Sequence, residues 1–399
     1  MPNVNDYTAL LSGDYWSGSN SKNAPAFVTF SFETKVQSDL PGNVFNAAAQ
    51  NSFRSMTNAE KDAARAALKD WADASGLVVL EVKAGHGDIR FGAYDFSLDA
   101  SWKGTAGFAY FPGTDVDRDY SYRSGIGGDV FLDYDYADDA HVLRHEIGHA
   151  LGFKHPFEGP LTLPGNLDNT DHTVMSYTGS RSGTLAPFDL DAVAAIYGDS
   201  SADGRGLDSW DWDAGKEILT QVGDDTGRNI FGVAVRDVID GKGGGDVICG
   251  FEGGDDLRGS GGKDKIYGGY GADTLSGGGG KDTLNGEEGS DSFVFDRLRT
   301  GGDEIRGYAN SKGDDDTLLF DDGAFGSLGR EADGTGKLLD KYFQSSFASV
   351  AESATARFLY ERDTGLLRYD ADGTGAKEAK IIASFNNFID LQVSDFIIV

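Results

Sequence analysis

The sequence has almost no cysteine, no long apolar run and a large excess of negative charge. One cysteine, Cys249, stands in 399 residues, so the chain cannot form an internal disulfide framework. No apolar stretch approaches the roughly 18 residues of a transmembrane helix. The formal net charge of −30 argues against nucleic acid or an anionic membrane surface as a partner. We therefore expect a cation as the natural counterpart of this chain.

At 399 residues the chain is longer than a single hydrophobic core usually supports, and its composition changes near residue 200. These two features predict two domains, 1–198 and 199–399. The first half has the pattern of an enzyme with helices and strands. Apolar spacing and capping residues, such as Thr57 with Glu60, predict helices over 58–75, 138–152 and 189–197. Runs of β-branched and aromatic residues predict strands over 27–32, 77–82, 88–92 and 129–133.

A nine-residue repeat dominates the middle of the second half. Its aspartates are Asp237, Asp246, Asp255, Asp264, Asp273, Asp282 and Asp291, each followed two positions later by an apolar residue. Glycine precedes each of the last six by two positions, as in GGYGADTLS (268–276). Glycine allows tight loops with inward carbonyls, and the apolar residue marks a minimal strand. Stacked copies predict a parallel β-roll whose loops enclose several structural Ca²⁺ ions.

The residues expected to line the calcium sites are Gly241, Gly243, Asp246, Gly250, Asp255, Gly259, Gly261, Asp264, Gly268, Asp273, Gly277, Gly279, Asp282 and Asp291. A flexible Gly/Asp linker is the alternative, which the shared register of seven aspartates and seven apolar residues disfavours. The second repeat position is not always glycine, so the number of filled sites stays open. Cys249 falls at the ninth repeat position, where we expect solvent exposure. Residues 199–236 are short and degenerate where we expect more β-structure.

The stretch RHEIGHALGFKH (144–155) holds three of the six histidines. His145 and His149, four residues apart, project from one helix face and can share a Zn²⁺ ion, with Glu146 between them. His155 lies off that face. Gly152 can end the helix in a left-handed conformation and turn the chain back, so that His155 reaches the same metal. Three protein ligands leave a position for water, which is typical of catalytic zinc. His141 is expected to be a surface histidine.

These motifs together resemble a known family. The pattern H-E-x-x-H-x-x-G-x-x-H and VMSY (174–177) resemble the metzincin signature and its Met-turn, and the glycine-aspartate repeat resembles the RTX nonapeptides of secreted bacterial proteins. With SGDYW (12–16) and PFDLDAVAAIYG (187–198), the chain resembles the serralysins over nearly its whole length. The resemblance implies an α+β metzincin catalytic domain with a mixed twisted sheet, followed by an all-β parallel β-roll with a β-sandwich cap.

The resemblance also implies roles for individual residues. Glu146 would be the general base acting on a zinc-bound water, and Tyr177 would ligate the resting zinc and later bind the oxyanion. Met175 would be the structural residue of the Met-turn. The stretch AGFAYFPG (106–113) would contain the edge strand that binds substrate backbone, through Gly107, Phe108, Ala109 and Tyr110. The implied activity is that of a zinc endopeptidase with broad specificity, holding one catalytic Zn²⁺.

The two ends of the chain bear on localisation. The first thirty residues lack the basic start and apolar stretch of a secretory signal peptide. The ending SDFIIV (394–399) can be read as a frayed terminal strand, but it resembles the C-terminal signal of type I secretion. We therefore expect a secreted, extracellular monomer. Its expected partners are polypeptide substrates and the type I secretion apparatus, with a proteinaceous inhibitor as a further candidate.

Two other interpretations remain open. A non-catalytic RTX surface or binding protein could carry a degenerate protease domain, although every residue that catalysis requires is present here. A cytosolic metalloprotease is the narrower alternative, against which the calcium repeats and the SDFIIV ending argue. Measuring hydrolysis with and without Glu146 discriminates the enzyme from the binding protein.

Overall fold

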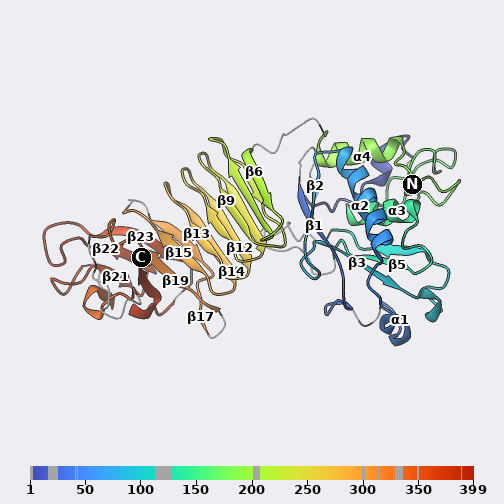
Figure 1. Ribbon diagram of the computed structural model, residues 1–399. Helices are drawn as coiled ribbons and strands as arrows, with labels where there is room; N and C mark the ends of the chain where they lie inside the picture. The colour runs from blue at the N-terminus through green and yellow to red at the C-terminus, as the bar shows by residue number, and fades with distance from the viewer. Residues whose placement is uncertain are drawn as a thin grey trace. The chain divides into compact units, whose positions relative to one another are not determined.

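The computed structural model describes residues 3–16, 26–40, 42, 44–112, 127–200, 207–298, 302–311, 314–326, 328, 336–347, 350–387 and 389–399. The chain divides into two compact units, Met1–Arg205 and Gly206–Val399, which are treated separately below (Figure 1). Among the described residues, no helix combines the length and apolar character that crossing a membrane requires.

The first unit is built on a five-stranded sheet with the order β2-β1-β3-β5-β4. Its strands are β1 (Phe27–Phe32), β2 (Val78–Glu81), β3 (Ile89–Tyr94), β4 (Gly107–Ala109) and β5 (Val130–Asp133). All neighbouring pairs are parallel except β4, which runs antiparallel to β5 at one edge. The four strands predicted from the sequence are present, within two residues at each end.

Helices α2 (Asn58–Asp73), α3 (Ala140–Ala150) and α4 (Pro187–Tyr197) accompany this sheet, together with the short elements α1 (Ala47–Asn51), η1 (Tyr7–Leu10) and η2 (Phe96–Leu98). The predicted capping box of α2 is present, with the Glu60 N–H donating to Thr57 and the Thr57 N–H donating to Glu60. Helix α4 begins two residues earlier than predicted because Pro187 occupies its first position.

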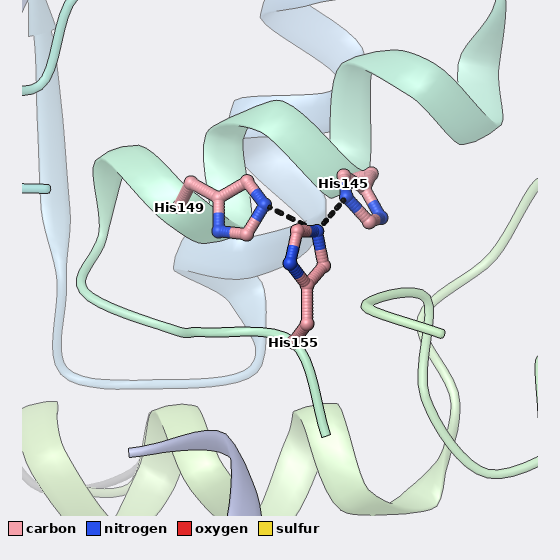
Figure 2. A group of neighbouring side chains, drawn as sticks. All are labelled: His145, His149 and His155. Carbon is pink, nitrogen blue, oxygen red and sulfur yellow. Dashed lines mark hydrogen bonds between the residues drawn. The ribbon is translucent and has the colours of Figure 1, made fainter. Parts of the chain in front are cut away.

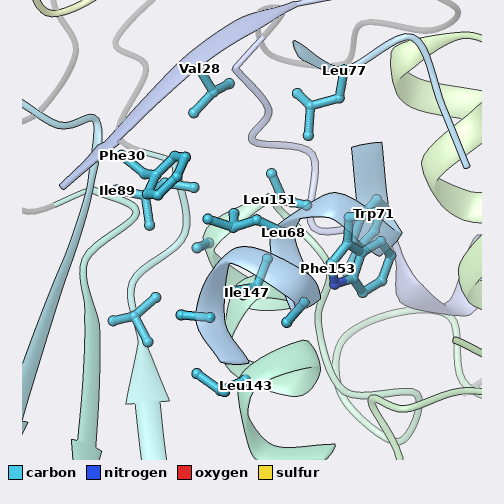
Figure 3. Packing of buried hydrophobic residues seen from close by; sticks show 14 of the residues in the cluster. Val28, Phe30, Leu68, Trp71, Leu77, Ile89, Leu143, Ile147, Leu151 and Phe153 are labelled. Carbon is cyan, nitrogen blue, oxygen red and sulfur yellow. The ribbon is translucent and has the colours of Figure 1, made fainter. Parts of the chain in front are cut away.

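The core of the first unit lies between the sheet and the helices (Figure 3). Val28 and Ile89 come from the sheet, Leu68 and Trp71 from α2, and Ile147 from α3. Burial of each such side chain contributes about 1.5–3 kcal/mol. The same packing holds α3, which carries the histidine motif, firmly against α2.

The repeat region of the second unit forms a parallel roll with two sheets (Figure 1). One sheet contains β9 (Asp237–Asp240), β11 (Asp256–Arg258), β13 (Thr274–Ser276) and β15 (Ser292–Phe295). The other contains β8 (Asn229–Phe231), β10 (Val247–Glu252), β12 (Lys265–Tyr270), β14 (Thr283–Glu288) and β16 (Asp303–Arg306). Successive repeats alternate between the sheets, so Ile248 pairs with Ile266 and Leu257 with Leu275. All seven repeat apolar residues are buried.

The described part of 199–236 contains β6 (Leu207–Asp213), β7 (Ile218–Gly223) and β8, so β-structure is present there although the sequence is degenerate. Strands β6 and β7 form an antiparallel hairpin, and β7 pairs in parallel with β9. The sequence concealed this because the hairpin lacks the glycine-aspartate period while still continuing the sheet.

The C-terminal strands continue the two sheets of the roll. Strand β19 (Thr317–Phe320) follows β15, and β24 (Phe396–Ile398) follows β19. On the other sheet, β23 (Lys380–Phe385), β22 (Leu366–Tyr369), β21 (Phe358–Glu361) and β20 (Phe343–Ser346) extend outward from β16. The small elements are β17 (Asn310–Ser311), β18 (Asp314–Asp315), η3 (Asp340–Tyr342) and η4 (Val393–Asp395).

The chain's final strand is buried, so the frayed alternative for SDFIIV is wrong. Phe396 and Ile398 are in the core of the second unit. Asp395 accepts hydrogen bonds from the side chain of Asn310 and the backbone N–H of Gln392. These bonds satisfy the buried carboxylate, and the strand that follows, β24, pairs in parallel with β19.

Candidate active site and metal centres

Helix α3 and the segment after it bring three histidines together (Figure 2). Asp139 caps α3, accepting from the N–H groups of His141 and Val142. The Nε2 atom of His155 lies 3.2 Å from Nε2 of His145 and 3.1 Å from Nε2 of His149. Zinc–nitrogen bonds of 2.0–2.1 Å at tetrahedral angles separate ligand nitrogens by about 3.3 Å. Both of these separations are close to that value, and the ligand atoms of the three histidines all lie within 4.8 Å of one another, so the group can hold one zinc ion.

The opposite nitrogens of the first two imidazoles are held by backbone carbonyls. Nδ1 of His145 lies 2.7 Å from the Val174 oxygen, and Nδ1 of His149 lies 2.7 Å from the Phe153 oxygen. Because a carbonyl oxygen only accepts, both Nδ1 atoms carry the proton. Burial lowers the pKa of His145 to about 3 and also lowers that of His149. Neutral rings leave the lone pairs of both Nε2 atoms facing the centre, which fits a cation.

Gly152 makes the turn that returns His155 to the helix. Its φ of 96° lies in the left-handed region, as predicted. A Cβ there would come within 2.1 Å of the Asp14 oxygen. The turn is held by residues from two segments that the sequence marked as landmarks. Trp16 Nε1 donates to the Ala150 oxygen, and the Tyr197 hydroxyl donates to the Leu151 oxygen, satisfying carbonyls at the end of α3.

Glu146 is buried beside the histidines and beneath the edge strand β4. Burial raises the pKa of Glu146 to about 8, and a cation held by the adjacent histidines would lower it again. A Cβ on Gly107 would lie 2.9 Å from Glu146 Cγ and 3.1 Å from its Oε1. Glycine at 107 thus lets the edge strand approach the carboxylate, a contact the sequence alone did not indicate.

The VMSY segment passes beneath α3. Met175 is fully buried, and a Cβ on Gly148 would come within 2.5 Å of its sulfur. Asp189, at the start of α4, accepts from the Thr173 hydroxyl and the Val174 N–H. Burial raises the pKa of Asp189 to about 6. Asp189 thereby fixes the turn whose Val174 carbonyl orients His145.

Tyr177 follows this segment and reaches the histidines. Its ring centroid lies 4.5 Å from that of His155 and 5.5 Å from that of His145. The side chain is otherwise open to solvent. Ser176 beside it is anchored to Asp168 by a 2.6 Å hydrogen bond. The tyrosine expected from the resemblance therefore lies with its ring against two of the three histidines.

Among the described residues, β4 is an edge strand of the sheet, and it lies next to this group. The Asp133 N–H donates to the Ala106 oxygen, and the Tyr110 N–H donates to the Asp129 oxygen. Because antiparallel strands alternate inward and outward bonding, Gly107 and Ala109 direct their backbone groups away from β5. Phe108 instead packs its ring on Trp102 and Phe131, at 4.3 and 4.6 Å between centroids. Of the four residues predicted to bind substrate backbone, Gly107 and Ala109 are therefore the two whose backbone N–H and C=O groups point away from β5.

The other described histidines stay outside the group of three. His141 is half-buried, and its Nδ1 lies 3.2 Å from the Ser182 oxygen. His172 contacts Asn169 through Nδ1 at 2.9 Å. Among the described residues, the potential metal ligands that gather in one group are His145, His149 and His155.

The repeat aspartates form two ladders inside the roll. In each ladder, Oδ1 of one aspartate accepts from the backbone N–H of the aspartate 18 residues earlier, for example Asp255 to Asp273 at 2.8 Å. The predicted aspartates Asp255, Asp264, Asp273, Asp282 and Asp291 follow this pattern, and Asp246 accepts in the same way from the backbone N–H of Arg228, which lies 18 residues earlier. The ladders hold the carboxylates in fixed positions without using their second oxygen.

The second carboxylate oxygens mark candidate calcium sites. Oδ2 is buried and without a hydrogen-bond partner in Asp246, Asp255, Asp264, Asp273 and Asp291. The glycine five residues before each aspartate leaves space beside that oxygen: a Cβ on Gly250 would lie 2.2 Å from Asp255 Oδ2 and 2.6 Å from the Gly268 oxygen. Converging carboxylate and carbonyl oxygens with no donor are the ligands that Ca²⁺ prefers.

The other glycines predicted to line the calcium sites occupy two kinds of position in the roll. Gly241, Gly259, Gly268 and Gly277 each lie against the Oδ2 of the next repeat aspartate. Gly243, Gly261 and Gly279 stack through parallel bridges between successive turns. Gly286 was missed, although it lies nine residues after Gly277 and its Cβ position is 2.1 Å from Asp291 Oδ2. The nine-residue period was sufficient to find it.

The ladders also extend past the last repeat. Asp303 accepts from the Asp282 N–H at 3.0 Å, and Asp316 accepts from the Asp291 N–H at 2.9 Å. The separations of 21 and 25 residues break the period of 18, which is why the sequence pattern did not reveal them. The loops between them carry extra residues, but the strands that follow return to register.

Two further features of the repeats differ from the simple pattern. At the second repeat position the non-glycine residues Lys242, Phe251, Ser260 and Glu287 all have positive φ, between 67° and 75°.

Cys249 is fully buried, so its expected exposure is wrong. On its sheet face it pairs with Phe231 and Tyr267 of the neighbouring strands, and position within the repeat does not reveal these large neighbours.

Known proteins are similar to this chain in its repeats and over about half of its length. The family model of the RTX calcium-binding nonapeptide repeat (4 copies) matches residues 231–266 and 258–293. A serralysin of Photorhabdus laumondii is 28% identical over 218 residues, which cover 47% of this chain and 42% of that protein. A serralysin of Proteus mirabilis is 27% identical over 263 residues, covering 54% and 51%.

Metallopeptidase AprA of Pseudomonas marginalis is 29% identical over 185 residues, covering 42% of this chain and 36% of that protein. The matched regions thus span about half or less of each of these relatives. Half-length similarity to several serralysins, together with the repeat match, confirms the resemblance predicted from the motifs. The chain is a relative of the serralysins and carries RTX calcium-binding repeats.

Proposed function

We propose that this protein is a secreted zinc-dependent endopeptidase of the metzincin type, with broad specificity and a calcium-stabilised β-roll. The observation that carries the proposal is the convergence of three histidine Nε2 atoms beside a buried glutamate. His145, His149 and His155 would hold the ion, and Tyr177 lies close enough to join them. When bound, zinc supplies Lewis acidity, which polarises the scissile carbonyl and lowers the pKa of water.

The chain's own residues supply the remaining functions. The Glu146 carboxylate would take a proton from the attacking water and return it to the leaving amine. The Tyr177 hydroxyl would donate a hydrogen bond to the oxyanion. The open edge of β4 would bind the substrate backbone through Gly107 and Ala109, aligning the peptide above Glu146. Binding through main-chain groups explains a broad sequence preference.

The repeats support the proposed localisation and partners. Extracellular calcium modules bind with dissociation constants of about 10⁻⁴–10⁻³ M, so their sites are empty in a cytosol and filled outside a cell. We infer that calcium stabilises the roll of the second unit after export by a type I secretion apparatus. Extracellular polypeptides are then the substrates, and the protein acts as a monomer.

The test is hydrolysis of a denatured protein in millimolar calcium. Wild-type activity should be lost on adding a zinc-selective chelator and return with added zinc, while Glu146→Gln should bind zinc and be inactive. Full activity of Glu146→Gln would refute the role of this centre. Zinc-loaded, folded wild type without activity would favour a non-catalytic RTX binding protein.

A further inference from the structure

Three exposed aromatic side chains surround the histidine group. Phe111 is 38% exposed, Phe157 is 40% exposed and Tyr177 is 70% exposed. Phe111 lies 5.8 Å from the His149 ring, Phe157 lies 5.0 Å from the His155 ring, and Tyr177 contacts Phe157 at 5.3 Å between centroids. A cluster of large apolar side chains that are exposed to solvent indicates a binding surface.

Phe111 is placed at the end of the open edge strand. It follows the last residue of β4 by two positions, and its carbonyl accepts from the Gly128 N–H at 3.1 Å. A peptide that pairs with Gly107 and Ala109 would therefore run past Phe111 as it passes His149. Side chains of that peptide that point toward the site would meet an aromatic ring.

Phe157 is held in place on the other histidine. Its ring is parallel to that of His155 within 5°. The loop that carries it is fixed by Lys154, whose ammonium donates to the backbone oxygens of Glu158 and Leu161 at 2.6 and 3.1 Å. A ring fixed by such contacts can offer a binding surface without first losing conformational freedom.

We propose, resting on the peptidase function above, that Phe111 and Phe157 determine specificity. The substrates are extended polypeptide segments with bulky apolar side chains next to the scissile bond. Each ring would cover such a side chain, removing apolar surface from water. Because the backbone contacts at β4 are independent of sequence, these rings supply the side-chain preference that the edge strand lacks.

The test compares two fluorogenic peptides that differ only in having phenylalanine or alanine on both sides of the scissile bond. The readout is the ratio of their kcat/KM values on one enzyme preparation, in which any loss of zinc or active fraction cancels. Phe111→Ser and Phe157→Ser should each lower the ratio by about tenfold, whereas Phe157→Leu should retain most of it. Leu98→Ser, which removes an exposed apolar side chain from η2, is the matched control and should match wild type.

The outcomes separate the two proposals. A ratio within about twofold of wild type in one serine variant overturns the role of that phenylalanine, and in both variants it overturns the inference. Wild type that cleaves the two peptides equally well also overturns the inference, while leaving the peptidase function intact. Wild type that cleaves neither peptide nor denatured protein refutes the proposed function itself.

Discussion

At the scale of single residues, glycine decides the closest contacts of the candidate active site. Gly107 lies against Glu146, Gly148 against Met175, and Gly152 against the backbone of Asp14. Only Gly152 also has a positive φ. Gly107 and Gly148 are explained by steric space instead, because Glu146 and Met175 lie too close to them for a Cβ atom to fit.

Replacement of Gly107 tests its contact with Glu146. In Gly107→Ala the new methyl group would displace the Glu146 carboxylate, so kcat should fall by about 10²-fold with little change in Tm. Peptide hydrolysis and thermal unfolding measure the two effects. Gly165→Ala is the control, since nothing lies within 4 Å of the added Cβ. Wild-type kcat in Gly107→Ala would show that the carboxylate position is unimportant.

Lys242 tests the cost of a left-handed residue in the roll. Its φ is 68°, and its ammonium pairs with Asp240 at the surface. Lys242→Gly and Lys242→Ala both remove this ion pair, but only glycine relieves the backbone. The calcium-loaded glycine variant should be more stable than the alanine variant by about 1 kcal/mol. Denaturant unfolding of the second unit measures this difference, and equal stabilities would contradict it.

At the scale of elements, a repeat turn combines an aspartate held by one oxygen with a glycine that leaves room beside the other. Oδ1 of Asp273 is bonded by the Asp255 N–H, and Oδ2 faces the space at Gly268. Neither residue creates the site alone. The same arrangement in successive turns explains why the period of the sequence is strict at these two positions and loose at others.

Gly268→Ala tests this arrangement. The new Cβ would lie 2.4 Å from Asp273 Oδ2, so the turn should bind one calcium ion fewer, as counted by equilibrium dialysis. Gly254→Ala is the matched control, because the equivalent position of a later repeat already holds Ala272 and the nearest atom is 3.3 Å away. Undiminished calcium stoichiometry in Gly268→Ala would exclude a site at this glycine.

At the scale of the whole molecule, calcium and protons compete for the same carboxylates. Burial raises the pKa of Asp255 to about 8, of Asp264 and Asp291 to about 7, and of Asp273 to about 6. These values lie above the ordinary aspartate pKa near 4. The calcium-free folded roll therefore binds more protons than the unfolded chain over this range. The contribution of these four aspartates to its stability is therefore largest below about pH 4 and is lost as the pH rises through about 6–8.

Two measurements follow from this linkage. Calcium-stripped protein should show a higher unfolding temperature for the second unit at pH 5.5 than at pH 8.5. Calcium binding at pH 6.5 should release protons, so titration heats should differ between buffers with different ionisation enthalpies, and this difference should vanish near pH 9. Buffer-independent heats at pH 6.5 would show that the ladder aspartates are already ionised.

Several features of this protein were readable from sequence because they depend on local conformation. The helical spacing of His145 and His149, the turn at Gly152 and the nine-residue period of the roll each involve residues close along the chain. Local backbone geometry repeats with a known period, so it leaves a visible pattern. The zinc-ligand candidates and most calcium-site candidates came from such patterns.

Tertiary packing decided what lies between distant segments. Val174 orients His145 across 29 residues, Gly107 approaches Glu146 from an edge strand, and Asp303 and Asp316 extend the ladders outside the period. Cys249 is buried because Phe231 and Tyr267 flank it on neighbouring strands. These contacts depend on how whole elements pack rather than on spacing along the chain. The sequence by itself determined which groups could bind metal, and packing decided how those groups are oriented, shielded and brought next to the edge strand β4.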